Sequence, residues 1–304
     1  MIEVLHAGLC DLVMDQGRPG RGALGVPVGG AAEPGALAAA NRLVGNDECA
    51  AGLEILLSGP SLRFPARGVV ALTGARFAAS RGSGAPVPWN ETLVLAAGET
   101  LTLAGAESGC RCWLAVRGGV AVPSVMGSRS TFLPGAFGGY LGRPLRSGDA
   151  LAIGAGAGAV RLLRAWPPAR GAGDAPLRVV AGPQTARFND AGLAAFFGGC
   201  FRVAAASDRR GLRLTGPAVT QAAAGLLSQG VLPGTVQVPP DGQPIILGWD
   251  GPVTGGYPVI AGVISADLPR MAQLRPGDDL GFSTVEVDVA RSLAPARWRI
   301  EVLA

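Results

Sequence analysis

Short apolar runs that contain β-branched residues recur along the whole chain and are separated by turn-forming residues. Such runs fit strands, because β-branched side chains pack well on a pleated surface. Of 304 residues, 48 are glycine and 24 are proline, and they follow no G-X-Y period, so we expect them in turns. The predicted class is therefore mainly β with a few short helices. The clearest predicted strands are 69–72, 92–95, 100–103, 113–116, 235–238, 244–247 and 285–287.

Three helices are expected against this background. The clearest spans 35–44, with a proline placed to open it and a glycine placed to end it, as is typical of helix boundaries. A second is predicted at about 190–197, where Asn189 is placed to cap the helix and two glycines to stop it. A third, shorter helical turn follows Asp267.

A change in composition divides the chain into two strand-rich halves. Length favours two domains of roughly 150 residues each, and the glycine- and proline-rich stretch 154–173 is typical of a boundary. We predict domains at 1–165 and 174–304. Each half also ends in a similar phrase, LRSGDAL at 145–151 and LRPGDDL at 274–280. These phrases indicate a duplicated barrel, although a GD turn before a strand is common in unrelated proteins.

All 26 basic residues are arginine, and the sequence contains no lysine. A Schiff-base lysine, a Walker A lysine and a biotinylated or lipoylated carrier lysine are therefore excluded within this chain. The one histidine, His6, excludes a histidine-rich metal site, and no metal is expected. A Ser-His-Asp triad would have to use His6, for which an ordinary strand position is the plainer interpretation. The glycine runs at 154–158 and 171–173 lack the strand-to-helix setting of a phosphate loop, so we expect linkers there.

Charge and cysteine content indicate a soluble, cytoplasmic protein. The formal net charge is only +4 and the arginines are scattered, so neither nucleic acid nor a membrane is an expected partner. The five cysteines are odd in number and form no CxxC pair, which is typical of a reducing compartment. No signal peptide is expected, because the N-terminal stretch carries acidic residues and no early basic cluster. The longest apolar stretch, 193–201, is too short to span a membrane.

In the first half, DQGRPG at 15–20 and GVPVGG at 25–30 place glycines and an arginine in a turn-rich strip. Glycines permit positive φ and the close approach of a ligand. The planar guanidinium of Arg18 can hold a carboxylate or phosphate through two hydrogen bonds. Alternatively, Arg18 pairs with Asp15 or Glu54 and ties the N-terminal segment to a barrel.

In the second half, SDRRGLR at 207–213 gathers three arginines and a carboxylate, and is either an anion site or a solvated turn. The stiff polar loops QVPPDGQP at 237–244 and TGGYP at 254–258 are of the kind in which binding sites are found. The acidic and phenolic side chains of this half are candidate bases and proton donors, and each alone is equally an ordinary turn or cap residue. They are Asp241, Asp250, Asp267 and Tyr257.

The order of these phrases resembles the biotin-dependent carboxyltransferase family, also called allophanate hydrolase subunit 2. Members of that family include the C subunit of bacterial ATP-dependent 5-oxoprolinase and a regulator of a sporulation kinase inhibitor. The resemblance covers nearly the whole chain. The matching phrases are DQGRPG at 15–20, GVPVGG at 25–30, ANRLVGND at 40–47, LEILLSGP at 53–60, GSRSTFL at 127–133, GTVQVPPDGQPIIL at 234–247, TGGYP at 254–258 and VISADLPRMAQLRPGD at 263–278.

The resemblance implies two cyclophilin-like β-barrel domains and a small amide or lactam substrate. It also implies a subunit-B-like partner, an A subunit in the case of 5-oxoprolinase, ATP shared with partner subunits, and biotin only on a partner protein, if at all. The site residues that it implies by matching phrase fall into two sets. The expected catalytic residues are Arg18, Arg129, Asp241 and Tyr257. The expected substrate-binding residues are Asn41, Asn46, Ser128, Arg209, Gln237, Gln243 and Thr254.

The resemblance predicts a subunit of an ATP-dependent 5-oxoprolinase, a cyclic amide hydrolase that is inactive without its partners. An unstrained lactam resists water; phosphorylation of its oxygen would create a leaving group, and arginines would stabilise the developing charge. One alternative is a carboxyltransferase subunit that takes a carboxyl group from a partner's biotin for urea or a related amide. Another is a regulatory module that acts on a histidine-kinase inhibitor. The departures from the family pattern at Met14, Glu33 and 248–253 leave the substrate open.

Overall fold

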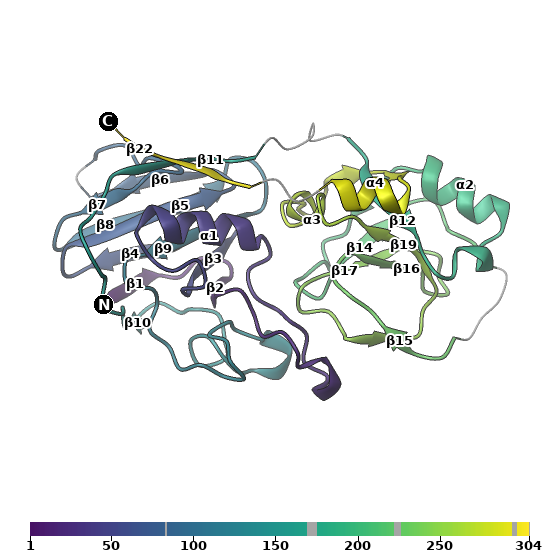
Figure 1. Cartoon of the computed structure of the whole chain (residues 1–304), viewed down its shortest axis with the longest axis horizontal. Coiled ribbons are helices and arrows are strands. Elements are labelled where there is room, and N and C mark those ends of the chain that lie inside the picture. The colour runs from purple at the N-terminus through teal and green to yellow at the C-terminus, as the bar shows by residue number, and fades with distance from the viewer. Residues whose placement is uncertain (83, 169–174, 222–225, 294–296, 304) are drawn as a thin grey trace. The chain divides into compact units, whose positions relative to one another are not determined.

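Figure 1 shows the computed structural model of the chain, which describes residues 1–82, 84–168, 175–221, 226–293 and 297–303. Contacts between Cα atoms divide the chain into two compact units, and both are discontinuous in sequence. The domain boundaries at 1–165 and 174–304 stay a prediction. The first unit consists of Met1–Arg18, Gly29–Pro168 and Arg297–Ala304, and the second of Pro19–Val28 and Ala169–Ala296.

The first unit is built mainly from short antiparallel strands. They are β1 (Ile2–His6), β2 (Asp11–Met14), β3 (Gly52–Leu56), β4 (Ser61–Phe64), β5 (Gly68–Gly74), β6 (Phe77–Arg81), β7 (Leu93–Leu95), β8 (Glu99–Ala106), β9 (Arg111–Val116), β10 (Ala150–Leu151), β11 (Leu163–Trp166) and β22 (Arg299–Val302). Two five-stranded sheets have the orders β10-β1-β4-β8-β6 and β2-β3-β9-β5-β7, and β11 pairs with β22 in a separate ribbon.

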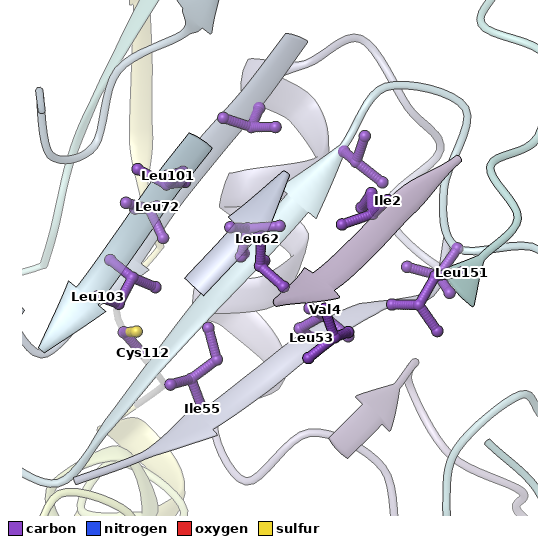
Figure 2. Close-up of a cluster of buried hydrophobic side chains, with 14 of the residues drawn as sticks. Ile2, Val4, Leu53, Ile55, Leu62, Leu72, Leu101, Leu103, Cys112 and Leu151 are labelled. Atoms are coloured by element: carbon purple, nitrogen blue, oxygen red, sulfur yellow. The ribbon is translucent and has the colours of Figure 1, made fainter. Parts of the chain in front are cut away.

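One hydrophobic core receives side chains from both five-stranded sheets. Figure 2 shows Ile2, Val4 and Leu62 from the first sheet together with Leu53 and Ile55 from the second. Leu53 and Ile55 share one face of β3 because side chains alternate along a strand. Each side chain of this size contributes about 1.5–3 kcal/mol when it is fully buried, so this core is a main source of stability in the first unit.

Helix α1 (Pro34–Leu43) packs against β5 and β9 of the second sheet. Its proline lies in the first turn, where a missing N–H costs no hydrogen bond. Three buried alanines, Ala36, Ala39 and Ala40, allow the helix to lie close to the strands. The hydroxyl of Thr73 on β5 donates a hydrogen bond to the carbonyl of Ala36 at 2.8 Å, which fixes the start of the helix on the sheet.

The second unit contains an eight-stranded sheet with the order β20-β13-β14-β17-β16-β19-β12-β21. Its strands and those of the ribbon β15-β18 are β12 (Leu177–Ala181), β13 (Phe201–Val203), β14 (Gly211–Thr215), β15 (Gln229–Gly230), β16 (Thr235–Gln237), β17 (Ile245–Leu247), β18 (Thr254–Gly255), β19 (Val259–Val263), β20 (Asp279–Leu280) and β21 (Phe282–Thr284). The two edge strands, β20 and β21, are separated only by Gly281. The sheet therefore almost closes into a barrel.

The remaining helices are short. They are η1 (Gly22–Leu24), η2 (Leu133–Gly135), η3 (Thr185–Arg187), α2 (Asp190–Gly198), α3 (Leu268–Met271) and α4 (Val287–Ser292). Asn189 caps α2 as predicted, with its Oδ1 accepting from the N–H of Gly192 at 2.7 Å. Within the described parts of the chain, no helix has the length and apolar character that crossing a membrane requires.

The two similar phrases, at 145–151 and 274–280, form turns with the same hydrogen bonds. In each turn the aspartate carboxylate accepts from the N–H three residues earlier, at 2.7 Å for Asp149 and 3.0 Å for Asp278. The aspartate carbonyl then accepts from a strand valine at 2.9 Å, Val4 in β1 and Val203 in β13. This shared pattern favours the duplicated-barrel interpretation over a coincidental turn.

The predicted class, mainly β with barrel-like sheets and a few short helices, is confirmed. Six of the seven strands named from the sequence coincide with β5, β7, β8, β9, β16 and β17, and the three predicted helices correspond to α1, α2 and α3. The strand predicted at 285–287 is wrong, because β21 ends at Thr284 and α4 begins at Val287. Asp288 in the first turn of α4 favours the helix through its dipole, and this local signal outweighs the β propensity of the valines.

Candidate functional site

Residues 15–18 of the phrase DQGRPG and the phrase GSRSTFL meet in the first unit around the carboxylate of Asp15, which follows β2. Its Oδ1 accepts hydrogen bonds from the N–H of Gly17 at 2.8 Å, the hydroxyl of Ser128 at 2.5 Å and the hydroxyl of Ser130 at 2.6 Å. Its Oδ2 accepts from the backbone N–H of Arg129 at 2.5 Å. One buried carboxylate thus joins the end of β2 to the loop of residues 125–131, which we name the serine loop.

The serine hydroxyls of this loop also serve as acceptors. Ser128 Oγ accepts from the N–H of Ser130 at 2.9 Å, and Ser130 Oγ accepts from the N–H of Asp15 at 2.8 Å. Ser128 and Ser130 are 1% and 0% exposed. Ser128, expected to bind substrate, is therefore placed where its hydroxyl holds the loop.

Arg18 approaches the same loop from the interior and is 1% exposed. Its Nε donates to the carbonyl of Val125 at 3.4 Å, and its Nη2 donates to the carbonyl of Ser130. The guanidinium lies over the ring of Phe137, with 5.2 Å between Cζ and the ring centroid. The contacts of Arg18 thus organise the backbone of the loop.

Arg129, in contrast, is exposed. Its Nε donates to the carbonyl of Val122 at 3.0 Å, while its backbone N–H is held by Asp15. No described residue accepts a hydrogen bond from Nη1 or Nη2 of Arg129. A guanidinium anchored at Nε and open at its outer edge can bind a carboxylate or phosphate through two parallel hydrogen bonds.

The glycine-rich strip before α1 packs against the residues that follow β2. The N–H of Ala31 donates to the carbonyl of Asp15 at 2.9 Å, and the N–H of Ala32 donates to Oε2 of the buried Glu54 at 2.7 Å. Gly30 has φ of +80°, and a Cβ there would lie 2.8 Å from backbone atoms of the 16–17 segment. Glycine is therefore required at this position, as expected for a close approach of two backbones.

Asn41 and Asn46 form a separate network at the end of α1. The side-chain amide of Asn41 donates to the carbonyl of Ala50 at 2.7 Å and accepts from Asn46 Nδ2 at 3.1 Å. Asn46 also donates to the carbonyl of Val116 at 2.8 Å and accepts from the N–H of Gly118 at 2.8 Å. These two expected substrate-binding residues are placed between backbone segments that they join.

The second unit brings Gln237 and Tyr257 together beside the ribbon β15-β18. Gln237 is buried at the end of β16, and its Nε2 donates to the backbone carbonyl of Tyr257 at 3.3 Å. A Cβ on Gly255 would overlap Nε2 of Gln237, so the Gln237 amide would have to shift to admit a side chain there. Tyr257 is 45% exposed, and Thr254 is also exposed. This unit therefore presents a hydroxyl and a phenol beside a buried amide.

The other expected site residues of the second unit are engaged in separate contacts. The Asp241 carboxylate accepts from the N–H of Gln243 at 3.0 Å, and the Gln243 side chain bonds both the N–H and the carbonyl of Gly216 at 2.9 and 3.3 Å. Arg209 is buried and binds Asp250 through two hydrogen bonds, at 2.8 and 3.2 Å. Asp250 belongs to the segment 248–253, which is expected from the sequence to depart from the family pattern.

Asp267, a candidate base, is instead the centre of an ion-pair network. It is fully buried and accepts from Nε and Nη2 of Arg178 at 3.2 and 2.5 Å. Burial alone raises the pKa of Asp267, but the hydrogen bonds and charge of Arg178, with the charge of Arg270, outweigh it and hold the pKa below its usual range. The carboxylate stays ionised and bound to Arg178.

The structure thus places Ser128 and the N–H of Arg129 on the carboxylate of Asp15, and Arg18 on two carbonyls of the same loop. In the second unit it places Gln237 beside Tyr257. The residues that sequence reasoning missed are Asp15 and Ser130. The spacing in DQGR points to Asp15 only as a partner for Arg18, and no local pattern shows that the hydroxyls of a loop more than a hundred positions later reach it.

The described glycine run 154–158 does not form a phosphate loop. The stretch 154–158 is not followed by a helix, and Nη2 of Arg117 donates to the carbonyl of Gly158 at 2.6 Å. The backbone of this stretch therefore presents a carbonyl oxygen to a cation, whereas a phosphate loop presents N–H groups to an anion. The run 171–173 lies outside the described residues. Where the structure describes the chain, no three His, Cys, Asp or Glu side chains gather as a metal site would need.

Comparison with known proteins gives matches over nearly the whole chain. The family described as "Carboxyltransferase domain, subdomain A and B" matches residues 24–284. The C subunit of Escherichia coli 5-oxoprolinase is 39% identical over 296 residues, which cover 95% of this chain and 93% of that protein. The urea amidolyase of Saccharomyces cerevisiae is 32% identical over 313 residues, which cover 96% of this chain and 17% of that protein.

A solved structure gives the same result for the fold. The crystal structure of the Kluyveromyces lactis urea amidolyase superposes with a TM-score of 0.87 at 32% sequence identity. The match covers 95% of this chain, which spans about a fifth (19%) of that enzyme. The resemblance drawn from the sequence phrases is confirmed.

Proposed function

The chain belongs to the carboxyltransferase family of subdomains A and B, and from this we propose that it is the C-type subunit of an ATP-dependent 5-oxoprolinase complex. The complex opens the lactam of 5-oxoproline to glutamate. The observation that carries this proposal is the mutual coverage with the 5-oxoprolinase C subunit, 95% of this chain and 93% of that protein. The urea amidolyase match, in contrast, covers 17% of a much longer protein.

Arg129 is the residue that we assign to substrate contact. 5-Oxoproline carries one carboxylate beside its lactam ring, and the outer edge of an anchored guanidinium suits such a group. Arg18 and Ser128 act in this proposal by holding the serine loop. For the other residues that the resemblance implies, a role in substrate binding or catalysis stays a proposal, made for each unit by itself. In the first unit they are Asn41 and Asn46. In the second unit they are Arg209, Gln237, Asp241, Gln243, Thr254 and Tyr257, of which Thr254 and Tyr257 are exposed.

ATP is proposed to be shared with the partner subunits, and the described glycine run 154–158 of this chain is not a phosphate loop. This assignment agrees with the absence of lysine from the sequence, which excludes a Walker A loop within the chain. The A and B subunits are the proposed partners, the cytoplasm is the proposed compartment, and the chain alone is expected to have no activity.

Reconstitution of the complex tests this proposal. The chain is co-purified with its A and B partners, and release of glutamate and of ADP is measured with 5-oxoproline and ATP. Arg129→Ala should raise KM for 5-oxoproline about ten- to a hundredfold, the effect of losing a charged hydrogen-bond pair. Arg67→Ala, which removes an exposed arginine from the turn between β4 and β5, is the matched control and should leave KM unchanged. An intact complex that releases no glutamate would refute the proposal.

Carboxyl transfer is the second candidate, favoured by the matches to urea amidolyase. In that reaction the biotin belongs to a partner, which agrees with the absence of lysine from this chain. A biotinylated carrier and a biotin carboxylase, added with urea and labelled bicarbonate, would yield a labelled carboxylated amide. The same complex would then leave 5-oxoproline intact.

A further inference from the structure

We infer that Asp15 is a positioning residue, whose buried carboxylate sets the direction in which Arg129 presents its guanidinium. The inference rests on the proposed function only where it takes Arg129 as the ligand contact. Its structural part depends on the four hydrogen bonds that Asp15 accepts from Gly17, Ser128, Arg129 and Ser130.

Only a carboxylate can satisfy these donors. The two backbone N–H groups, of Gly17 at Oδ1 and of Arg129 at Oδ2, cannot reverse their direction. An asparagine offers one acceptor oxygen, so its amide NH2 would face one of these N–H groups in either orientation. Asp15→Asn therefore removes at least one buried hydrogen bond. At the same place it brings two donors together, the amide NH2 of the new side chain and a backbone N–H.

Three hydrogen bonds hold Arg129, and one of them is to Asp15. Its backbone carbonyl accepts from the N–H of Gly139 at 3.1 Å. The Nε bond to the carbonyl of Val122 fixes the side chain, and the bond from its N–H to Asp15 fixes the backbone from which that side chain extends. A ligand contact works only when it is held to within about half an ångström. Loss of the backbone bond should therefore move the guanidinium while leaving its charge in place.

The other contacts of the serine loop do not replace this bond. Arg18 binds the carbonyls of Val125 and Ser130, which are acceptors on either side of Arg129, and thus leaves the N–H of Arg129 to Asp15 alone among the described residues. The N–H side of Arg129 consequently depends on Asp15, whereas its carbonyl is held by the N–H of Gly139. The loop as a whole depends on both Asp15 and Arg18.

A double-mutant cycle in the reconstituted complex tests the inference. Asp15→Asn should raise KM for 5-oxoproline about tenfold, with a smaller change in kcat. In an Arg129→Ala background, Asp15→Asn should cause no further rise in KM, because the group that it positions is gone. Effects that multiply in the double variant would overturn the inference. If Asp15→Asn does not fold, Ser128→Ala, which removes one donor, serves in its place and should act in the same direction.

The matched control is Asp149→Asn. Like Asp15, Asp149 accepts from the backbone N–H of an arginine, here Arg146 in the turn before β10. It accepts in addition from the guanidinium of Arg143. This variant should leave KM unchanged, which separates positioning from a general loss of stability.

Hydrogen exchange of the full chain keeps the inference testable if 5-oxoproline proves not to be a substrate. Asp15→Asn should speed amide exchange at least about tenfold in a peptide that covers the serine loop, because it removes a bond worth about 1.4 kcal/mol or more. Asp149→Asn should not. Absence of turnover in the wild-type complex would reject the proposed function alone. Unchanged exchange in the serine loop of Asp15→Asn would reject the positioning role.

Discussion

Ionisation of Asp11 should make the first unit less stable as the pH rises from about 4 to about 7.5. Asp11 is the first residue of β2 and is 0% exposed. Its Oδ2 accepts from the N–H of Gly8 at 2.6 Å, whereas its Oδ1 has no hydrogen-bond partner among the described residues. Burial raises the pKa of this carboxyl to about 6, and the bond from Gly8 lowers it only in part.

The surroundings of Asp11 explain the direction of the shift. Asp11 pairs across the sheet with Ile55, which pairs in turn with Cys112, so the three side chains share the core face of their strands. Figure 2 shows Ile55 and Cys112 within that core. Burial also raises the pKa of the Cys112 thiol, with the charges of Asp11 and Glu54 adding to the effect. The charge that Asp11 acquires is therefore placed in an apolar environment, which disfavours ionisation.

The magnitude follows from linkage. A rise from the model-compound value of 3.8 to about 6 is worth about 3 kcal/mol, because each pH unit corresponds to about 1.4 kcal/mol. Below pH 3.8 the carboxyl is protonated in both the folded and the unfolded chain, and its favourable contribution is complete. That contribution is lost as the pH rises through about 6, where the folded chain also releases the proton.

The assay is urea unfolding of the wild type and of Asp11→Asn at a series of pH values, followed by tryptophan emission. Asparagine can still accept from the N–H of Gly8 but does not ionise. The free energy of unfolding of the variant minus that of the wild type should rise by about 3 kcal/mol between about pH 4 and about pH 7.5. A difference that stays constant with pH would refute the reasoning.

Asp149→Asn supplies a control of opposite sign. The hydrogen bonds from Arg143 hold the pKa of Asp149 below its usual range. Wild-type stability relative to this variant should therefore be complete at neutral pH and be lost as the pH falls below about 4. A scan that gives both variants the same sign would show that the titration of other groups dominates.

Two further substitutions test contacts of the second unit by urea unfolding. Asp250→Ala leaves the buried guanidinium of Arg209 without its carboxylate and should lower the free energy of unfolding by about 3–5 kcal/mol; a loss below about 1 kcal/mol would mean that water replaces the partner. Asn189→Ala removes the cap that accepts from Gly192 and should cost about 1 kcal/mol, whereas no change would contradict the capping role.

Local patterns predicted those elements whose signals lie within a few residues. Helix α1 has its proline and alanine face in one stretch of sequence, and α2 has Asn189 immediately before it. The strand predicted at 285–287 failed where two local signals compete, since valines favour a strand and Asp288 favours a helix start. The discontinuity of the two units, which gives Arg297–Ala304 to the first, depends on the pairing of β11 with β22, and no local pattern reveals that pairing.

The candidate site was predictable as a set of phrases but not as a set of roles. The sequence phrases name Arg18 and Arg129 alike as expected catalytic residues. They differ in the folded chain, because Arg18 is buried against the serine loop and Arg129 is exposed on it. A buried arginine must place its donors on fixed carbonyls, since a charge without partners is costly in the interior.

The same reasoning explains why the role of Asp15 could not be predicted from its sequence neighbours. A carboxylate two positions before a glycine–arginine pair is most simply taken as the partner of that arginine. In the folded chain its oxygens bind backbone N–H and hydroxyl groups from two segments. Such a carboxylate joins two backbone segments, and in the inference drawn above it affects ligand binding by positioning Arg129. Functional assignment in this family should therefore ask first which arginine of a conspicuous phrase keeps its outer edge open, and then which carboxylate holds that arginine in place.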